Sequence, residues 1–439
     1  MTNIIGIRRE DKNPWERRVP LIPSHLHELK KLHGLKFVVQ PSPIRVFADD
    51  DFRLEGAAVQ ESLSSCQVIM AVKEIPIPLF EPGKAYFFFS HTIKGQPANM
   101  PMLRRMIEQG CTLIDYERMV DGNGRRLVFF GRQAGEAGMI DTLWALGRRL
   151  VYEGLENPFT KLDQTFRYQS LVEVKEVTAE IGAQIRRDGL PSPLVPFICG
   201  FTGYGHVSQG AQEMYDLLPV EEVTPEEFRK FLAWKNFSGH RVYKIVFREE
   251  HMVRRKDQTR PFDLQEYYDY PETYEPVLEP YLLHLTALIN GIYWAPKYPR
   301  FVTKAFVRAL YERAERPRLK VIGDISCDIE GGVECTIETT SPQNPVYVYE
   351  AATGCILAGI EGNGPVIMAV DNLPAEMSLE SSVFFSQCLK SFLPDIGAAD
   401  FRGTFEDCRL PDPVRKAVIL FKGEFTPAYR YMKDFLEPS

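Results

Sequence analysis

The N-terminal part of the chain alternates short apolar runs with amphipathic stretches, and this alternation constrains the fold more than any other feature. The apolar runs have the length of strands, whereas the stretches between them place apolar residues at helical spacing. Pro23-Ser24 and Gly34 bracket one of these helices with a start and a stop signal. Because repeated units of this kind form parallel sheets covered by helices, the sequence predicts an α/β domain. The segments are, in order, IIGIRRE, PSHLHELKKLHG, KFVVQ, CQVIMAV, AYFFFSH, PMLRRMIEQG and CTLIDYE.

The pattern returns in the middle of the chain. GEAGMIDTLWALGRRLVYEG, which begins at Gly135, predicts a long amphipathic helix that crosses between domains. RDGLPSPLVPF (188–197) predicts a loop, and a second α/β unit begins directly after it. Farther on, NPVYVYEAATGCILAGI predicts two strands around a turn at Thr353-Gly354, and AEMSLESSVFFSQCLKSFL predicts an amphipathic helix. A chain of 439 residues is expected to form two or three domains.

The composition limits the class of protein. Apolar residues make up 44% and charged residues 25% of the chain, as in average soluble proteins. The formal net charge of -7 and the lack of a long basic block argue against nucleic-acid binding. No apolar run has the length of a membrane span, and the start MTNIIGIRREDKNPWERRVP lacks the apolar core of a secretory signal. We therefore expect no membrane partner and a cytoplasmic location, or the mitochondrial matrix in a eukaryote.

Cysteine and histidine residues give no sign of a metal site. The eight cysteines contain no C-x-x-C pair, and the eight histidines are scattered along the chain. Such cysteines are expected to be reduced and mostly buried. No bound metal is expected.

The stretch CGFTGYGHVSQGAQ (199–212) has the context of a phosphate-binding turn, because it follows an apolar strand and leads into a helix. Gly203 allows the tight turn, Gly205 lets the backbone approach a pyrophosphate, and the helix start supplies N–H donors. Ser208 stands where the usual pattern has a third glycine. We therefore predict a dinucleotide site that includes the six residues Gly203, Tyr204, Gly205, His206, Val207 and Ser208; an ordinary strand-to-helix turn is the alternative.

Charged residues farther along leave the nature of the dinucleotide open. Glu221 and Glu222 lie near the end of the next strand, where an acidic residue would meet a ribose 2′-hydroxyl. Arg229 and Lys230 are close enough in sequence to bind a 2′-phosphate instead. The choice between NADPH and NADH remains open at this point.

Blocks along nearly the whole chain resemble the lysine-ketoglutarate reductase part of aminoadipic semialdehyde synthase, and more distantly saccharopine and alanine dehydrogenases. They run in order from about residue 3 to about residue 425: RREDKNPWERRVPLIP, VKEIP, FFSHTIKGQPANM, LIDYERMVD, GRRLVFFGRQAGEAGMI, FTGYGHVSQGAQEM, LINGIYW, GDISCDIEGGVE and DNLPAEM. The resemblance implies two Rossmann-like domains with the active site in the cleft between them. The first domain would be discontinuous (1–135 and 372–439) around a dinucleotide-binding domain (136–371). The chain stops where the bifunctional proteins continue, so it resembles a stand-alone reductase half.

The resemblance also implies the reaction, which is condensation of L-lysine with 2-oxoglutarate and reduction of the imine to saccharopine. NADPH is the cofactor of the group that the chain most resembles, and NADH is the alternative. These small molecules are the expected partners, along with a possible second copy of the chain. Another amino-acid or imine dehydrogenase, similar to alanine dehydrogenase, is a competing interpretation, and a non-catalytic nucleotide sensor is a second.

By resemblance, five residues of the first domain take part in the reaction. Lys73 and His91, which each follow an apolar strand, match the acid/base pair. Arg18 and Lys94 match residues that bind substrate carboxylate. Glu117 matches a carboxylate that lies beside the two lysines, Lys73 and Lys94. Taken alone, Lys73 would be a solvated side chain, His91 a structural one and Arg18 part of a surface ion-pair cluster. Cations near Lys73 would lower its pKa and let it act as a base.

Four polar residues farther along the chain follow apolar runs at expected strand ends. They are expected to contact the nicotinamide or a ribose of the cofactor. These residues are Asn290, Asp324, Asp371 and Asn372.

Overall fold

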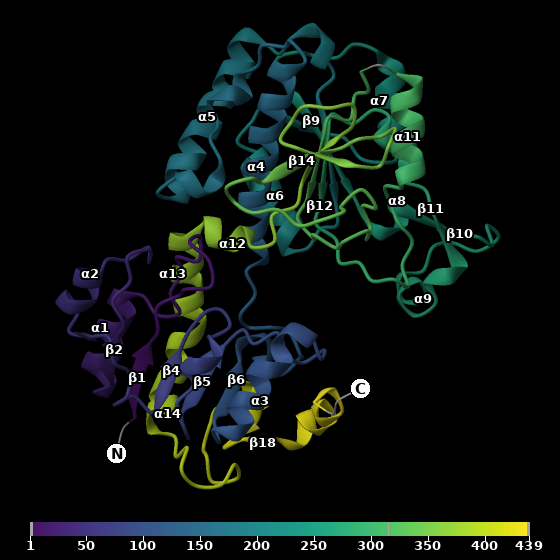
Figure 1. Cartoon of the computed structure of the whole chain (residues 1–439). Coiled ribbons are helices and arrows are strands. Elements are labelled where there is room, and N and C mark those ends of the chain that lie inside the picture. The colour runs from purple at the N-terminus through teal and green to yellow at the C-terminus, as the bar shows by residue number, and fades with distance from the viewer. Residues whose placement is uncertain (1–2, 315, 437–439) are drawn as a thin grey trace. The chain divides into compact units, whose positions relative to one another are not determined.

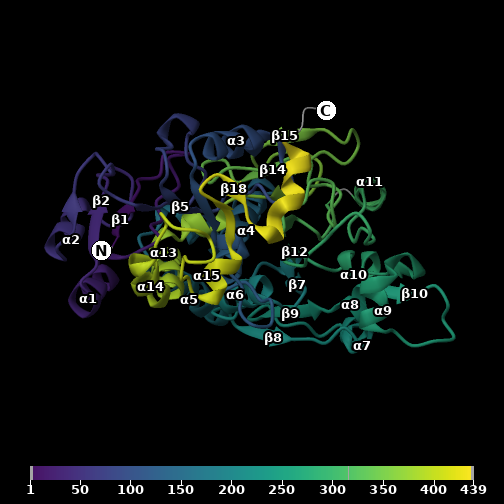
Figure 2. The same ribbon diagram turned by 90° about the horizontal axis from the view of Figure 1, so that it is seen from below.

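The computed structural model describes residues 3–314 and 316–436, and the chain divides into two compact units (Figures 1 and 2). The first unit comprises Met1–Phe129 and Ser378–Ser439, and the second comprises Phe130–Met377. Each contains an eight-stranded, mainly parallel sheet with helices. The predicted fold class, two Rossmann-like α/β domains of which the first is discontinuous, is confirmed.

The sheet of the first unit runs β18-β17-β6-β5-β4-β1-β2-β3. Six strands are parallel, and β17 and β18 are antiparallel to their neighbours. Because the chain leaves β1 toward β2 on one side and returns to β4 on the other, the carboxyl ends of β1 and β4 form a topological switch point. The strands are β1 (Ile4–Ile7), β2 (Lys36–Val39), β3 (Ala58–Val59), β4 (Val68–Met70), β5 (Ala85–Phe88), β6 (Thr112–Asp115), β17 (Val418–Phe421) and β18 (Glu424–Phe425).

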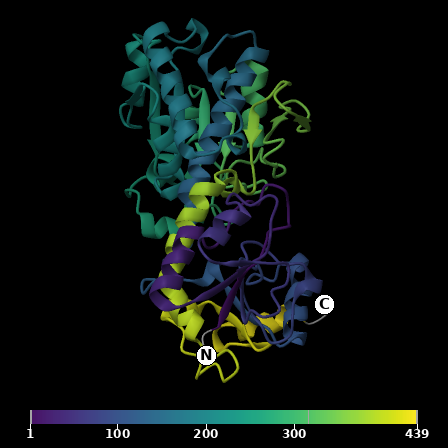
Figure 3. The same cartoon turned by 90° about the vertical axis from the view of Figure 1, so that its left-hand side faces the viewer.

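Helices from both ends of the chain pack in the first unit. Helix α13 lies beside α1 (Figure 3), where the Ser386 hydroxyl is 2.7 Å from Nδ1 of His25 and accepts from the Ile22 N–H. The return of the chain at α13 therefore completes this unit. Its helices are α1 (Pro23–His33), α2 (Asp49–Leu54), α3 (Met100–Glu108), α13 (Ser378–Leu389), α14 (Leu393–Ala398) and α15 (Asp412–Lys416).

The sheet of the second unit runs β15-β14-β16-β13-β12-β7-β9-β8, with β14 and β15 antiparallel to their neighbours. Its switch point lies between β7 and β12. The strands are β7 (Ile198–Thr202), β8 (Val220–Glu222), β9 (Val242–Phe247), β12 (Ala287–Asn290), β13 (Val321–Asp324), β14 (Val346–Tyr349), β15 (Ile356–Ala358) and β16 (Val366–Met368), with a separate antiparallel pair β10 (Val253–Arg255) and β11 (Tyr274–Pro276). The predicted strand pair around Thr353-Gly354 is confirmed.

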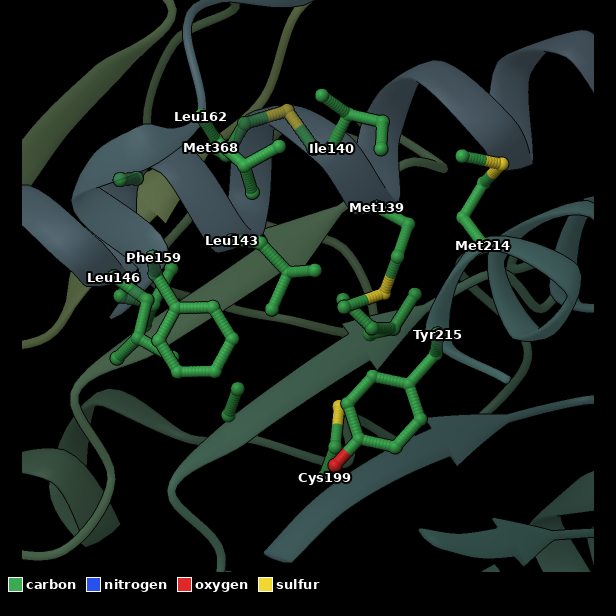
Figure 4. Close-up of a cluster of buried hydrophobic side chains, with 14 of the residues drawn as sticks. Met139, Ile140, Leu143, Leu146, Phe159, Leu162, Cys199, Met214, Tyr215 and Met368 are labelled. Atoms are coloured by element: carbon green, nitrogen blue, oxygen red, sulfur yellow. The ribbon is translucent and has the colours of Figure 1, made fainter. Parts of the chain in front are cut away.

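Helices cover both faces of this second sheet. Alternate residues of β12 face opposite cores, because Ile289 and Leu288 belong to different buried clusters. Figure 4 shows part of the cluster that includes Ile289, with Leu143 and Met368 labelled. Figure 1 shows α4, α5 and α6 on one side and α7 and α11 on the other. The helices are α4 (Gly131–Tyr152), α5 (Leu171–Asp188), α6 (His206–Tyr215), α7 (Phe228–Trp234), α8 (Glu249–Met252), α9 (Leu264–Asp269), α10 (Glu279–Leu282), α11 (Lys304–Arg313) and α12 (Leu373–Glu376).

The long helix α4 does not cross between domains, so that prediction is wrong. All of its residues belong to the second unit, where Met139, Leu143 and Leu146 are buried against the sheet. Its close approach to α6 depends on two glycines. A Cβ atom at Gly135 would lie 1.9 Å from the Val207 carbonyl oxygen, and one at Gly210 would lie 2.1 Å from the Arg132 carbonyl oxygen. The helical periodicity of the sequence could not show that this contact keeps all of α4 in one unit.

Two buried carboxyl groups meet inside the second unit. The Asp141 Oδ1 atom accepts from the Thr165 N–H at 2.8 Å and from its hydroxyl at 2.9 Å. Asp141 Oδ2 and both carboxyl oxygens of Glu376 are buried, and the Phe166 backbone approaches Glu376. Burial raises the pKa of both groups, and the charge of Asp141 and a hydrogen bond to it raise the pKa of Glu376 further. We therefore expect the two carboxyl groups to share a proton in the folded state.

We expect Glu376→Gln to stabilise the protein increasingly as pH rises. A carboxyl whose folded pKa is raised contributes stability at low pH that is lost as pH rises through the folded pKa, by about 1.4 kcal/mol per pH unit. The glutamine amide keeps a donor toward Asp141 and does not titrate. Urea unfolding between about pH 5 and about pH 8 should show a widening gap between variant and parent. Parallel curves, like those expected for the exposed control Glu176→Gln, would contradict the shared proton.

The structure also bears on the cysteines, on membrane spans and on metal ligands. Seven of the eight cysteines are buried or half-buried and all are free thiols, which confirms that prediction. No helix within 3–314 and 316–436 combines the length and the apolar character of a membrane span. In the same ranges, no three His, Cys, Asp or Glu side chains gather as metal ligands.

Candidate functional site

The loops that follow β1 and β4 in the first unit carry two of the five residues predicted for this unit. Lys73 follows β4 and is half-buried, and Arg18 lies in the loop after β1 with only 4% of its surface exposed. Both therefore stand at the switch point, the usual place for a ligand in an open α/β sheet. Burial, and next the charge of Arg18, lower the pKa of Lys73. A lysine in this setting exchanges protons more readily than a solvated one.

Glu16 binds the edge of the Arg18 guanidinium that carries Nε and Nη2. Its two carboxyl oxygens each accept a hydrogen bond at 2.7 Å, one from Nε and one from Nη2. Both side chains are buried, so the interpretation of Arg18 as part of a surface ion-pair cluster is wrong. Breaking a buried pair of this kind leaves an uncompensated charge, so Glu16 fixes the position of Arg18 beside Lys73.

Glu10 holds the backbone on which Lys73 stands. Its Oε1 accepts from the Val72 N–H at 2.7 Å and its Oε2 from the Lys73 N–H at 3.0 Å. Burial, followed by the charge of Glu16, raises the pKa of Glu10 to about 7. This carboxyl group is thus a positioning group that ties the loop after β4 to the loop after β1.

His91 follows β5 and is held by Glu74, the residue after Lys73. Its Nδ1 lies 2.7 Å from Glu74 Oε1, and Lys12 donates to Glu74 Oε2 at 2.6 Å. Burial opposes ionisation of Glu74, but the bonds from His91 and Lys12 prevail and lower its pKa to about 2. His91 has a φ of 47°, and Asn99 donates to its carbonyl oxygen at 3.0 Å. Within the described part of the chain, no protein group binds Nε2 of His91.

Lys94 and Glu117 lie in loops at the same edge of the sheet. Lys94 is exposed, three residues after His91. Glu117 follows β6 and forms an ion pair with Arg126 at 3.6 Å. The Glu117 N–H donates to buried Asp115, which also accepts from Ser90. Arg126 is therefore the ion-pair partner of Glu117 in the structure. That Glu117 balances the positive charge of Lys73 and Lys94 stays a prediction.

Sequence reasoning missed Glu10, Glu16 and Glu74. Glu16 and Glu74 lie within two residues of the predicted cations Arg18 and Lys73, so a search for acidic neighbours of these cations could have found them. Nothing in the sequence shows that Glu10 reaches across to Val72 and Lys73, because 62 and 63 residues separate them.

The glycine motif of the second unit forms a turn between β7 and α6. Gly203 has a φ of 79°, in the left-handed region that glycine adopts without strain. Gly205 caps α6, has a φ of -76°, and would place a Cβ atom in open space. The helix has ten residues, so its first N–H groups and its dipole favour an anion at this end. The open space at Gly205 fits the pyrophosphate of a dinucleotide.

The other residues of the turn take different positions. Ser208 is fully buried, and its hydroxyl accepts from Gln212 at 3.0 Å. Tyr204 is 41% exposed and stacks under the Arg248 guanidinium, 5.0 Å from ring centre to Cζ. His206 and Val207 form the first turn of α6, where Val207 approaches Gly135.

Asn290 and Asp324 are paired neighbours on β12 and β13. The Asn290 amide donates to Asp324 at 2.8 Å and accepts from Thr202 at 2.7 Å, so a network crosses the carboxyl ends of three strands. Burial raises the pKa of Asp324 to about 6. Asp371 is exposed, and Asn372 precedes α12. The predicted contact of these four residues with a cofactor stays a prediction.

Glu222 does not stand beside the glycine turn. It ends β8 at the edge of the sheet, and β9 lies between β8 and β7 (Figure 2). Its carboxylate lies 3.4 Å from the Lys244 ammonium and is 59% exposed. The predicted contact of Glu222 with a cofactor ribose stays a prediction.

Comparisons with known proteins agree with this architecture. Residues 6–137 match the family model "Alanine dehydrogenase/PNT, N-terminal domain". The mitochondrial alpha-aminoadipic semialdehyde synthase of Bos taurus is 35% identical over 99% of this chain and 48% of its own length. The chain thus spans about half the length of that curated relative. A saccharopine dehydrogenase (NAD+, L-lysine-forming) of Yarrowia lipolytica is 25% identical over 87% of this chain and 89% of its own.

A solved structure shows the same fold. An L-alanine dehydrogenase superposes with a TM-score of 0.62 and 18% sequence identity, covering 99% of both chains. At this identity the likeness concerns the fold alone.

Proposed function

Because this chain is homologous to about half of the alpha-aminoadipic semialdehyde synthases and carries the N-terminal domain of the alanine dehydrogenase/PNT family, we propose that it is an oxidoreductase that forms saccharopine. It joins L-lysine to 2-oxoglutarate and reduces the imine, in a reversible reaction of lysine degradation. The observation that carries the proposal is the gathering of Lys73, His91 with Glu74, and Arg18 with Glu16 at one strand-end edge.

Lys73 serves as the proton acceptor for the substrate amine. The ε-ammonium of lysine must lose a proton before its nitrogen can attack the ketone carbon of 2-oxoglutarate. Because burial and Arg18 lower the pKa of Lys73, its amine is neutral in a larger fraction of molecules than a solvated lysine. A base of this kind, placed within hydrogen-bond reach, provides general base catalysis.

His91 serves as the proton donor for the departing water. When the C–N bond has formed, the carbinolamine oxygen must gain a proton so that the C–O bond can break. Glu74 binds Nδ1 and orients the ring, which leaves Nε2 for the substrate. Because its pKa is lowered to about 2, Glu74 stays ionised and remains an acceptor for the His91 ring.

The substrates carry three carboxylates in all, and we assign their binding to the cations around this pair. Arg18, held by Glu16, provides a fixed positive charge, and exposed Lys94 provides a mobile one. Glu117, beside Arg126, limits the excess of positive charge.

The second unit holds the dinucleotide, NADP(H) in preference to NAD(H), and no metal is required. Residues 203–208 and the first N–H groups of α6 bind the pyrophosphate, which occupies the open space at Gly205. The bound cofactor supplies the hydride that reduces the imine carbon. Asn290 and Asp324 hold the ends of β12 and β13, and Asp371 and Asn372 contact the cofactor from the loop after β16.

These substrates place the protein in the cytoplasm or the mitochondrial matrix, possible sites of lysine degradation. The bovine relative is named as mitochondrial. Lysine, 2-oxoglutarate and saccharopine are its partners, with self-association as a further proposal.

A panel of amino acids and oxo acids, assayed with NADPH and NADH, tests the reaction. We expect oxidation of the reduced nicotinamide with lysine and 2-oxoglutarate together, and none with either alone. Turnover with pyruvate and ammonia instead would replace the proposal by an alanine dehydrogenase-like activity. Saturable dinucleotide binding without turnover on any pair would favour a sensor.

Glu10→Gln is expected to lower kcat about tenfold, because small displacements of a catalytic group are costly. The N–H groups of Val72 and Lys73 each donate to a different carboxyl oxygen of Glu10. A glutamine side chain has a single oxygen that can accept from them. Its amide would face one of these donors and displace Lys73. Steady-state kinetics should show the loss in kcat, while exposed Glu61→Gln serves as the control. A Glu10→Gln enzyme with parental kcat and pH profile would show that Glu10 does not position Lys73.

A further inference from the structure

The order of strands in the second sheet decides which residues can meet the adenosine end of the cofactor. β8 follows β7 in the chain, but β9 is the strand that pairs with β7 (Figure 2). In a dinucleotide-binding sheet, the residues that recognise the adenosine ribose stand at the carboxyl end of the strand next to the glycine turn. In this chain that position belongs to Arg248 and Glu249, the two residues after β9.

The backbone ties this strand end to the glycine turn. The Gly203 N–H donates to the Phe247 carbonyl oxygen at 2.8 Å, directly before Arg248. The Arg248 N–H in turn donates to Nδ1 of His251 at 3.0 Å, and Nε2 of His251 lies 2.9 Å from Glu226. The backbone of Arg248 is thus bound at both sides.

The side chain of Arg248 is exposed. Its guanidinium lies over the ring of Tyr204, 5.0 Å from the ring centre. Among the residues that the structure describes, no carboxylate forms an ion pair with it within 4.0 Å. Stacking on an aromatic ring restricts the guanidinium without using its N–H donors, which remain available for an anion.

The carboxylate of Glu249 is bound by another side chain. It is 8% exposed, and its Oε1 accepts from the Tyr268 hydroxyl at 2.9 Å. It lines a pocket of about 240 Å³ with Ile292 and four tyrosines (Tyr267, Tyr268, Tyr293 and Tyr298). Ile292 also lies next to Gly203, since a Cβ atom at Gly203 would be 3.5 Å from it. An aromatic pocket therefore adjoins the glycine turn, and a flat ring could stack there.

We propose that Arg248, stacked on Tyr204, binds the 2′-phosphate of NADP(H), and that the tyrosine-lined pocket receives the adenine. This assignment rests on the proposed dinucleotide site and deepens it. A planar guanidinium with free donors matches a phosphate, whereas a site for NAD(H) presents an available carboxylate to the ribose hydroxyls. Here the carboxylate of that position, Glu249, is already bound by Tyr268.

The test is calorimetric titration with ADP-ribose and its 2′-phosphate, two probes that lack the nicotinamide. We expect the parent protein to bind the phosphorylated probe more tightly. Arg248→Ala should weaken binding of that probe about 10–100-fold, as loss of a hydrogen bond to a charged group does, and should change ADP-ribose binding less than about twofold. Arg248→Lys should retain part of the preference. Exposed Arg229→Ala on α7, which the sequence also offered for this phosphate, is the matched control.

Unchanged binding of the phosphorylated probe by folded Arg248→Ala would overturn the assignment, as would a loss of preference in Arg229→Ala alone. A parent protein that binds neither probe would refute the dinucleotide site and this assignment together. A parent that prefers the phosphorylated probe through Arg248, yet turns over no substrate pair, would support the assignment and refute the proposed reaction.

Discussion

Lys73→Met and His91→Gln are each expected to lower turnover about 10²–10⁴-fold, the usual contribution of a positioned base or acid, without weakening dinucleotide binding. Lys73→Met removes the amine that accepts the substrate proton, so the rise of activity with pH on the acid side should flatten. His91→Gln removes the ring that Glu74 orients. Because both act in one proton-transfer sequence, the double variant should lose less than the product of the single losses. Stopped-flow and steady-state kinetics across pH measure these effects.

Matched controls exist in the same unit. Lys36 is exposed at the amino end of β2, and His33 is exposed at the end of α1. Lys36→Met and His33→Gln should keep parental turnover. If Lys73→Met and His91→Gln also kept near-parental turnover and an unaltered pH profile, both side chains would be structural and the acid and base would have to be sought elsewhere.

Gly205→Val is expected to weaken dinucleotide binding about 100-fold or more, which corresponds to loss of two charge-assisted hydrogen bonds. The valine side chain would occupy the open space where the pyrophosphate approaches the N-terminus of α6. The protein itself should tolerate the change, because the φ of -76° suits any residue and no atom lies within 4 Å of the new Cβ. Titration with NADPH and thermal unfolding separate the two effects.

Gly122→Val is the control for this substitution. Gly122 is exposed in the first unit, and its Cβ would also meet nothing within 4 Å. A folded Gly205→Val protein that binds NADPH as tightly as Gly122→Val would place the dinucleotide away from the glycine turn.

Local patterns were enough to predict the elements that hold the site. Strand-length apolar runs ended at the positions where Lys73 and His91 stand, and the glycine spacing predicted the turn at Gly203 and Gly205. These features depend on residues close in sequence, which determine strand ends, turns and helix starts. The paired domains and the discontinuous first domain came from the resemblance along the chain.

Features that depend on tertiary packing could not be predicted in this way. Glu222 was predicted from its place near the end of the next strand in the chain, but the order of strands in the sheet, in which β9 lies between β7 and β8, depends on packing. Glu10 and Glu74 look like any other surface carboxylate in the sequence, although one holds the Lys73 backbone and the other holds His91. Likewise, only the packing of α4 against α6 shows that this helix belongs to a single unit.

The most direct test of the proposed reaction is the mass of the product formed from lysine, 2-oxoglutarate and NADPH deuterated at the transferable position of the nicotinamide. The account predicts saccharopine in which one hydrogen is replaced by deuterium, which fragmentation locates on the former ketone carbon of 2-oxoglutarate, at the new C–N bond. Deuterated 2-hydroxyglutarate, or deuterated glutamate formed when ammonia is supplied, with no C–N bond to lysine, would contradict the account.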